Sequence, residues 1–295
     1  MDMNDNEAGG FEAQRPLMFA IAYRMLGSAS EAEDIVQEAY LRYQAVSQDQ
    51  IVSHKAFLST IVTRLCLNQL QSARVQRESY IGPWLPEPVL TDADARSAPV
   101  ESAELHESLS LAFLRLLEQL TPLERAIFLL REVFDYDYAE IAAILEKEEA
   151  TCRQLLSRAK KHITSGRPRF KPTPEAHRAM LDRFVNAVYE GELGGLVQLL
   201  ADDVVLWADG GGKVRGNLTH ALHGRESVAR FAIGSTKLIA EPRQIEIVEV
   251  NGQPALIIRA NDEARIVLFI EMNQDRIFEI LVVGNPDKLK MLNGS

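Results

Sequence analysis

Five polar side chains near residue 155 have the chemistry that reads the edges of DNA bases. They recur at three- and four-residue intervals, which would place them along one face of a helix. Arginine can pair with guanine, glutamine with adenine, and lysine with phosphate. The five candidates are Arg153, Gln154, Ser157, Arg158 and Lys161. The opposite face is apolar and consists of Cys152, Leu155, Leu156 and Ala159. The pattern predicts an amphipathic helix that begins near Ala150 or Thr151.

Two helices must precede this candidate DNA helix and position it. Thr121 and Glu124 have the spacing of a capping box, with a proline at the first helical position. Asp137 and Glu140 repeat the spacing before a second apolar stripe. A short helix, a tight turn and a second helix with a basic outer face are typical of a helix-turn-helix. We therefore predict an all-α module with a helix-turn-helix over residues 102–164.

A plainer interpretation also fits these residues, namely a helical hairpin whose charges are simply solvated. The turn over residues 146–149 reads EKEE, so it lacks the glycine that is common in helix-turn-helix turns. It also brings acidic groups close to where phosphates would lie. The hairpin alone does not decide between the two interpretations.

The composition limits the function classes. The chain has 295 residues, 46% of them apolar, and a net charge of −10, which argues against a general nucleic-acid coat protein. Cys66 and Cys152 lie on apolar helical faces and are expected to be buried thiols in a reducing cytoplasm. No signal segment or membrane-spanning apolar run is present, so we expect a cytoplasmic protein without a membrane partner. No metal-ligand spacing is present either, and we expect no metal and no cofactor.

Residues 11–78 are expected to form a first all-α module of three helices. The second helix would start after a Ser30 cap with Glu33 at N3, and would bury Ile35, Ala39, Leu41, Tyr43 and Val46. Its outer face is acidic, whereas the third helix, over about 53–77, is basic. This polarity suits a module with one protein partner and one nucleic-acid partner.

Two proline-containing stretches separate the domains. Residues 79–101 and 165–175 are predicted to be linkers. Trp84 and Leu85 are unusual in a disordered tether, because an exposed tryptophan normally docks on something. We therefore expect the first linker to have one fixed anchor.

Residues 176–295 form a third predicted domain with a different pattern. Helices over about 180–200 precede alternating strands, the first over 203–209 and a second, KVRG, over 213–216. A helix over 224–233 and further strands follow. The pattern predicts an α+β cone built on a strongly bent antiparallel sheet.

The order of these motifs resembles the extracytoplasmic-function (ECF) sigma factors of bacterial RNA polymerase. The resemblance rests on DIVQEAY at 34–40, AFLSTIVTRLCLNQL at 56–70 with trailing arginines, and LTPLERAIFLLREVFDYDYAEIAAIL at 120–145. It implies that Asp34, Gln37 and Glu38 contact core RNA polymerase. It also implies that the −10 element of promoter DNA is contacted by Arg64, Asn68, Arg74 and Arg77. The five candidates of the helix-turn-helix would then contact the −35 element. Asn68 stands where the family usually has aspartate. This difference affects which promoter sequence we would expect the protein to read, more than its role.

Three further segments resemble the signatures of one ECF subgroup with a fused SnoaL-like domain. The first is Trp84, Leu85, Pro86, Glu87 and Pro88 in the linker. The second is Asp209, Gly210, Gly211, Gly212 and Lys213, and the third is Asn285, Pro286, Asp287, Lys288 and Leu289. The resemblance implies that the cone regulates the sigma modules in cis through contacts among these segments. It also implies that no dedicated anti-sigma factor is needed, and it leaves a small ligand of the cone open.

The SnoaL-like resemblance raises the alternative of an enzyme. Catalytic members of that fold use an acid or base inside the cone, for which Asp209, His220 and His223 are candidates, with Trp207 and Tyr189 as pocket walls. A histidine near a glycine-rich turn is more often a surface residue, so we expect no catalysis. The alternatives are therefore a free-standing helix-turn-helix regulator with a ligand-sensing cone, and a cyclase or isomerase fused to DNA-binding modules.

Overall fold

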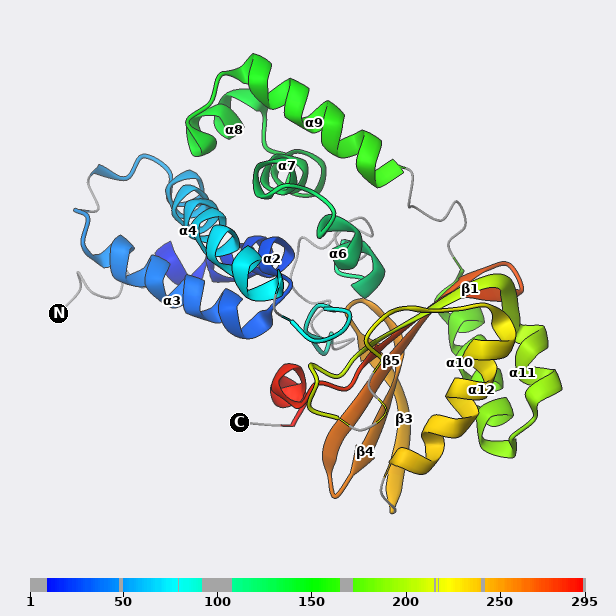
Figure 1. The fold of residues 1–295 in the computed structure, drawn as a ribbon. Helices are drawn as coiled ribbons and strands as arrows, with labels where there is room; N and C mark the ends of the chain where they lie inside the picture. Colours follow the sequence, from blue (N-terminus) through cyan, green and yellow to red (C-terminus); the bar gives the residue numbers. More distant parts are fainter. Residues whose placement is uncertain are drawn as a thin grey trace. The chain divides into compact units, whose positions relative to one another are not determined.

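The computed structural model describes residues 10–47, 50–78, 80–91, 108–164, 172–214, 216, 218–239 and 242–293, with only the backbone of 73–78 and 164. The chain divides into two compact units. The first contains Met1–Glu78 and Leu114–Gly166, and the second contains Ser79–Phe113 and Arg167–Ser295. Figure 1 shows the helices of the first unit in blue to green and the sheet of the second in yellow to red. Residues 80–91 of the first linker and the first three residues of α6 (Leu111–Leu117) therefore belong to the same unit as the cone.

The first helical module contains α2 (Arg15–Leu26), α3 (Ala29–Gln44) and α4 (His54–Glu78). The predicted cap of α3 is wrong by two residues, because Ser28 is the N-cap and its hydroxyl accepts from the Glu31 amide at 3.2 Å. Ile35, Ala39 and Tyr43 are buried as predicted, whereas Leu41 is 60% exposed. The shifted start of the helix does not account for the exposure of Leu41. Leu41 lies on the face of α3 that is turned to solvent.

The second module contains α6 (Leu111–Leu117), α7 (Pro122–Phe128), the π-helical turn η3 (Leu129–Val133), α8 (Tyr138–Leu145) and α9 (Glu149–Thr164). Both predicted capping boxes are formed, at Thr121 with Glu124 and at Asp137 with Glu140. The turn dispenses with glycine because Glu146 itself adopts the left-handed conformation, at φ 52°. Of the helix expected before Leu120, residues 101–107 lie outside the described part of the chain.

Buried hydrogen bonds join the two helical modules within the first unit. The Ser59 hydroxyl of α4 and the Tyr136 hydroxyl are 2.6 Å apart. The Arg125 guanidinium of α7 donates to the Met25 carbonyl at 2.6 Å and to Glu118 at 2.7 Å. Arg125 is almost fully buried, so this arrangement satisfies a charge that would otherwise be costly to bury. The two modules thus form one packed body.

The second unit is a six-stranded sheet with helices on one face (Figure 1). Its helices are α10 (Pro174–Glu190), α11 (Leu193–Leu199), α12 (Arg225–Ser235), and the 3-10 turns η4 (Thr236–Leu238) and η5 (Pro286–Leu292). Its strands are β1 (Leu200–Asp209), β2 (Leu222–His223), β3 (Arg243–Val250), β4 (Gln253–Ala260), β5 (Glu263–Asn273) and β6 (Arg276–Val283), in the order β2-β1-β6-β5-β4-β3.

Two expectations about this sheet are wrong. It is not wholly antiparallel, because β1 runs parallel to β6, from Leu206 opposite Ile280 to Asp209 opposite Val283. The predicted strand over 213–216 is not formed, since its described residues lie in a turn, and β2 pairs with β1 instead. A four-residue apolar-polar alternation beside three glycines is too short to specify a strand. The predicted fold class, two all-α modules followed by an α+β cone, is confirmed.

The second unit has two apolar clusters. One lies between the helices and the sheet and includes Phe184, Leu206 and Ile280. The other lies around Phe269 and takes in Leu85 and Leu111, which flank residues 92–107. The linker therefore supplies part of the core of the C-terminal domain.

Candidate functional site

The acidic face predicted to contact a protein partner lies on α3. Asp34 and Gln37 are exposed, and Glu38 accepts a hydrogen bond from Arg42 one turn later at 2.9 Å. Helical spacing places the three side chains on one side of α3. Within the first unit, this surface is therefore exposed and can contact a macromolecular partner.

The residues predicted for −10 DNA lie on α4, and the structure gives one of them other partners. Arg64 donates from Nε to the Ile144 carbonyl at 2.9 Å and forms an ion pair with Glu146 at 3.0 Å. These are the C-terminal carbonyls and the C-cap of α8, where the helix dipole favours a cation. Asn68 is exposed one turn further along α4. The side chains of Arg74 and Arg77 lie outside the described residues.

The five residues predicted for −35 DNA are all exposed on α9, and the four apolar residues on its other face are buried. Arg153 pairs with Glu149 at 2.7 Å and lies 4.6 Å above the Tyr138 ring. Arg158 lies 3.8 Å from the buried carboxylate of Glu124. Acidic neighbours thus hold both arginines along the helix, while Gln154 and Ser157 present polar groups between them.

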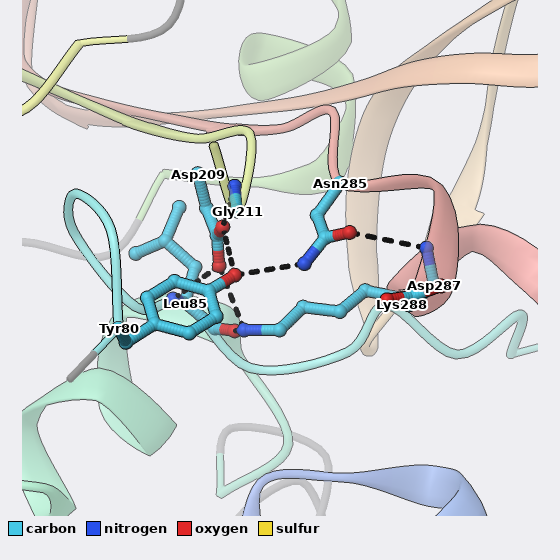
Figure 2. Close-up of polar contacts among 7 residues, drawn as sticks. All are labelled: Tyr80, Leu85, Asp209, Gly211, Asn285, Asp287 and Lys288. Atoms are coloured by element: carbon cyan, nitrogen blue, oxygen red, sulfur yellow. Dashed lines mark hydrogen bonds and ion pairs between the residues drawn. The ribbon is translucent and has the colours of Figure 1, made fainter. Parts of the chain in front are cut away.

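The three signature segments meet at Asp209, the last residue of β1 (Figure 2). Its buried carboxylate accepts four hydrogen bonds. Oδ2 accepts from the Leu85 amide at 2.8 Å and from Lys288 Nζ at 2.7 Å. Oδ1 accepts from the Tyr80 hydroxyl at 2.5 Å and from the Gly211 amide at 3.1 Å. A carboxylate with four donors is fully satisfied, which makes its burial tolerable.

Lys288 completes the site from η5. Besides Asp209, its ammonium donates to the Leu85 carbonyl at 2.5 Å and lies 4.0 Å from the centre of the Trp84 ring. Asp209 and Lys288 therefore bind both backbone polar groups of one linker residue, Leu85, and the Trp84 ring covers the ammonium. We call Tyr80, Leu85, Asp209, Asn285 and Lys288 the linker anchor.

The remaining members of the segments shape this anchor. The Asn285 amide donates to the Tyr80 hydroxyl at 2.8 Å, and its carbonyl accepts from the Asp287 amide at 3.1 Å. Gly211 has φ +57°, and a Cβ there would lie 2.4 Å from the Asn285 side chain, so the close approach requires glycine. At the surface, Lys213 forms an ion pair with Asp287. Pro86, Glu87 and Pro88 are buried behind Leu85.

Two participants were missed from the sequence, Tyr80 and Asn251. Asn251 occupies the β3–β4 turn with φ 54° and is fully buried. Its Oδ1 accepts from the Val89 amide and its Nδ2 donates to the Leu109 carbonyl, both at 2.9 Å. One side chain thus joins the chain on either side of residues 92–107. The Asn251-Gly252 pair signals a hairpin turn, but nothing in the sequence indicates what that turn would bind.

Burial and hydrogen bonding set the protonation behaviour of the anchor. Burial and the neighbouring Asp209 carboxylate raise the pKa of the Tyr80 hydroxyl well above its usual range. Tyr80 therefore stays a neutral donor to Asp209. The hydrogen bond from Lys213 lowers the pKa of the surface residue Asp287.

Comparisons with known proteins decide the family. The Sigma-70 region 2 family matches residues 11–75, and the Sigma-70, region 4 family matches residues 110–163. The ECF RNA polymerase sigma factor SigJ of Mycobacterium tuberculosis is 39% identical over 230 residues, covering 77% of this chain and 72% of SigJ. A probable ECF RNA polymerase sigma factor of that species, SigI, is 30% identical over 302 residues, covering 99% and 98%. This chain belongs to the ECF RNA polymerase sigma factors.

The crystal structure of M. tuberculosis SigJ is similar to this ECF sigma factor over nearly its full length, which agrees with the assignment. Its TM-score is 0.75 at 33% identity, and the match covers 95% of this chain and 97% of that one. The protein therefore directs core RNA polymerase to promoter DNA in transcription initiation, and its SnoaL-like domain is part of the shared architecture. Neither a free-standing DNA-binding regulator nor a fused cyclase is favoured by these relatives.

The residues considered for catalysis are not gathered in this sigma factor. Asp209 and Tyr189 line a cavity of the cone, whereas His220 and His223 are exposed and are not among its lining residues. Trp207 is not a wall of that cavity, because it packs in the cluster around Phe269. Across the described residues, no cluster of three or more metal-ligating side chains is found, and no helix is long and apolar enough to cross a membrane.

Proposed function

We propose that the protein is a sigma factor whose C-terminal domain regulates promoter use in cis by holding the linker between regions 2 and 4. The observation that carries this proposal is the buried Asp209–Lys288 pair, which binds both the amide and the carbonyl of Leu85. We propose further that the cone has no catalytic role, since Asp209 is committed to four donors, and that no dedicated anti-sigma factor is required.

We propose that the three groups of residues act in the order that the family implies. Asp34, Gln37 and Glu38 would bind core polymerase. Arg64, Asn68, Arg74 and Arg77 would contact the −10 element, and the five residues of α9 would contact the −35 element. Support comes from the exposure of the α3 and α9 residues and from their spacing along single helix faces.

The packed first unit implies a resting form. By their nominal positions, the −10 and −35 elements lie about 25 base pairs apart, which is roughly 85 Å of duplex at about 3.4 Å per base pair. A compact body with as many residues as the first unit has a radius of gyration of only about 14 Å, so it is much too small to span that length of duplex. The two modules must therefore separate to contact both elements, which would release Arg64 from Ile144 and Glu146. Because the cone holds residues on both sides of 92–107, it restricts the chain that must extend.

Transcription in vitro with core RNA polymerase tests this proposal. Lys288→Met removes the charge that holds Leu85, and Lys290→Met removes an exposed lysine of the same 3-10 turn, outside the three segments, as the matched control. We expect Lys288→Met to change the amount of transcript from a specific start several-fold, with little change for Lys290→Met.

Two results would contradict the proposal in different ways. Equal transcription by the wild type, Lys288→Met and Trp84→Ala, each folded by circular dichroism, would remove the regulatory role. Promoter binding that does not depend on core polymerase, without initiation, would remove the sigma role for this chain.

A further inference from the structure

A cavity of about 460 Å³ lies between the helices and the sheet of the second unit. A volume of that size is typical of sites that bind small organic molecules. Its deep wall consists of apolar side chains from α10, α12 and four strands, among them Phe184, Leu206, Phe231, Leu256 and Leu268. Water gains few hydrogen bonds against such a wall, whereas an apolar molecule gains contacts along its whole length.

The charged side chains of this wall are bonded to other groups of the protein. Among the described residues they are Asp209, Arg243, Glu263 and Arg265. Asp209 is paired with Lys288, and Glu263 is paired with Arg265 at 2.8 Å. The Arg243 guanidinium donates to a backbone carbonyl of η4 at 2.7 Å and lies 4.8 Å from the centre of the Tyr189 ring. A charged ligand would have to compete with these partners, so the described wall does not favour one.

The serine, threonine and asparagine side chains of the wall are also engaged or lie at its edge. Ser235 and Thr236 donate through their hydroxyls to carbonyls one turn earlier in α12, at 2.8 and 2.7 Å. Asn293 accepts from the Ala264 amide at 2.6 Å. Asn261 lies in the exposed turn before β5. Binding in the cavity would therefore depend mainly on apolar contact and on shape.

The opening of the cavity is apolar where it meets solvent. Tyr189, Val214 and Leu238 line the cavity and are 44%, 37% and 54% exposed. They belong to α10, the turn after β1 and η4, so separate parts of the chain form the opening. Single exposed apolar residues are common, but three around one opening are typical of a binding surface.

The cavity shares residues with the elements that hold the linker. Asp209, Pro286 and Leu289 line the cavity. Asp209 also binds the Leu85 amide, and Leu289 packs in the same apolar cluster as Leu85. A molecule that fills the cavity gains contacts with the end of β1 and with η5 in the arrangement that holds the linker. It would therefore bind this form more tightly and stabilise it.

We propose that this cavity binds an uncharged, apolar organic molecule, and that the bound molecule stabilises the linker anchor. The second part rests on the proposed regulation in cis. The wall suits a hydrocarbon-rich compound with rings or an aliphatic chain. It does not suit a nucleotide, a sugar or an organic anion, whose polar groups would lose their water against apolar side chains.

Two dyes that differ in one group test the site on the full-length protein. We expect N-phenyl-1-naphthylamine to bind with enhanced fluorescence. Its affinity should exceed that of 8-anilinonaphthalene-1-sulfonate, which has the same rings and a sulfonate, by about tenfold or more, because the sulfonate must be desolvated. Ala232→Phe, which fills the cavity from α12, should remove the signal of the uncharged dye. Ser227→Phe adds the same ring to the exposed face of α12 as the matched control and should keep the signal.

The site and the ligand class can each fail in this experiment. Unchanged binding of the uncharged dye in Ala232→Phe would overturn the site, and Val185→Phe replaces that variant if it does not fold. Equal or tighter binding of the sulfonate dye to the wild type would overturn the uncharged ligand class.

Hydrogen exchange at the Leu85 amide tests the coupling, because Asp209 accepts a hydrogen bond from that amide. N-phenyl-1-naphthylamine should slow this exchange several-fold in the wild type and should leave it unchanged in Ala232→Phe. Exchange that is not slowed in the wild type would overturn the coupling. These measurements need no polymerase, so they can fail while Lys288→Met still alters transcription, and the reverse also holds.

Discussion

Lys288 and Asp209 form a buried ion pair, with Nζ and Oδ2 2.7 Å apart and side-chain exposures of 7% and 0%. The pair encloses the backbone of Leu85, which lies more than a hundred residues earlier in the chain. It therefore converts part of a proline-rich linker into a fixed component of the C-terminal domain. Changing Lys288 leaves the Asp209 charge buried without its cation and removes the donor to the Leu85 carbonyl. Changing Asp209 leaves the Lys288 charge buried without its carboxylate and removes the acceptor of the Leu85 and Gly211 amides.

Lys288→Met should destabilise the second unit by about 3–5 kcal/mol, because it leaves the Asp209 charge buried without its partner. Lys213→Met removes a half-exposed lysine beside the same site and should change stability by about 0–1 kcal/mol. Urea unfolding followed by tryptophan fluorescence measures both values. Equal midpoints for the two variants would contradict the assigned role of Lys288.

Tyr80→Phe should weaken the anchor by about 1–3 kcal/mol, since Asp209 and Asn285 each lose a hydrogen-bond partner. The folded pKa of Tyr80 is raised above its unfolded value of about 10. Its contribution is therefore fully present below about pH 10 and is lost as the pH rises further. The stability difference between wild type and Tyr80→Phe should shrink above that pH in urea titrations. A constant difference up to pH 11 would contradict this account.

His177 should make the second unit sensitive to acid. Burial lowers the pKa of its imidazole, although a hydrogen bond to the Ile270 carbonyl opposes the shift. A depressed pKa means that the folded state binds the proton less well, so stability is present above about pH 6.5 and declines as the pH falls. His177→Gln should flatten this dependence in thermal unfolding between pH 7 and 5. His220→Gln, at an exposed position, serves as the control and should retain the wild-type slope.

Asn251 should act as a two-sided clamp. Asn251→Asp keeps an acceptor for the Val89 amide but loses the donor to the Leu109 carbonyl, whereas Asn251→Gly loses both and still suits the left-handed backbone. We expect a loss of about 1–3 kcal/mol for each unsatisfied group, and a further loss in Asn251→Asp from burying a carboxylate beside the Leu109 carbonyl. Hydrogen exchange at the Val89 amide distinguishes the two, because only Asn251→Gly should accelerate it strongly. Equal protection of the Val89 amide in both variants would show that this amide is hydrogen-bonded to a group other than the side chain at position 251.

Gln154 should affect promoter choice more than stability. Gln154→Ala removes an amide from the exposed face of α9 and should reduce binding of the polymerase–sigma complex to its promoter by about 1–3 kcal/mol, with weaker discrimination at one −35 base. Gln119→Ala, at an exposed position before α7, is the matched control. Competition between promoter and base-substituted templates measures the effect. Uniform weakening on all templates would indicate a phosphate contact instead.

Local sequence patterns were sufficient to predict those features that depend only on interactions between residues close in sequence. The capping boxes at Thr121 and Asp137 and the burial of Cys152, Leu155 and Ala159 follow from spacing within a few residues. The same reasoning failed at Ser30, where Ser28 offered an equally good cap, and at residues 213–216, where the alternation was too short. Parallel pairing of β1 with β6 could not be predicted, because pairing is decided by partners some seventy residues apart.

The sequence by itself determined the three kinds of domain, the amphipathic faces and the family resemblance, because each resides in periodicity or in contiguous motifs. Only the tertiary structure decided that Asp209 holds Leu85 with Lys288, that Tyr80 and Asn251 take part, and that Arg64 caps α8. Three short segments in one chain do not reveal which atoms meet. Buried polar groups must find partners wherever the fold brings donors and acceptors together, and that requirement is set by long-range packing.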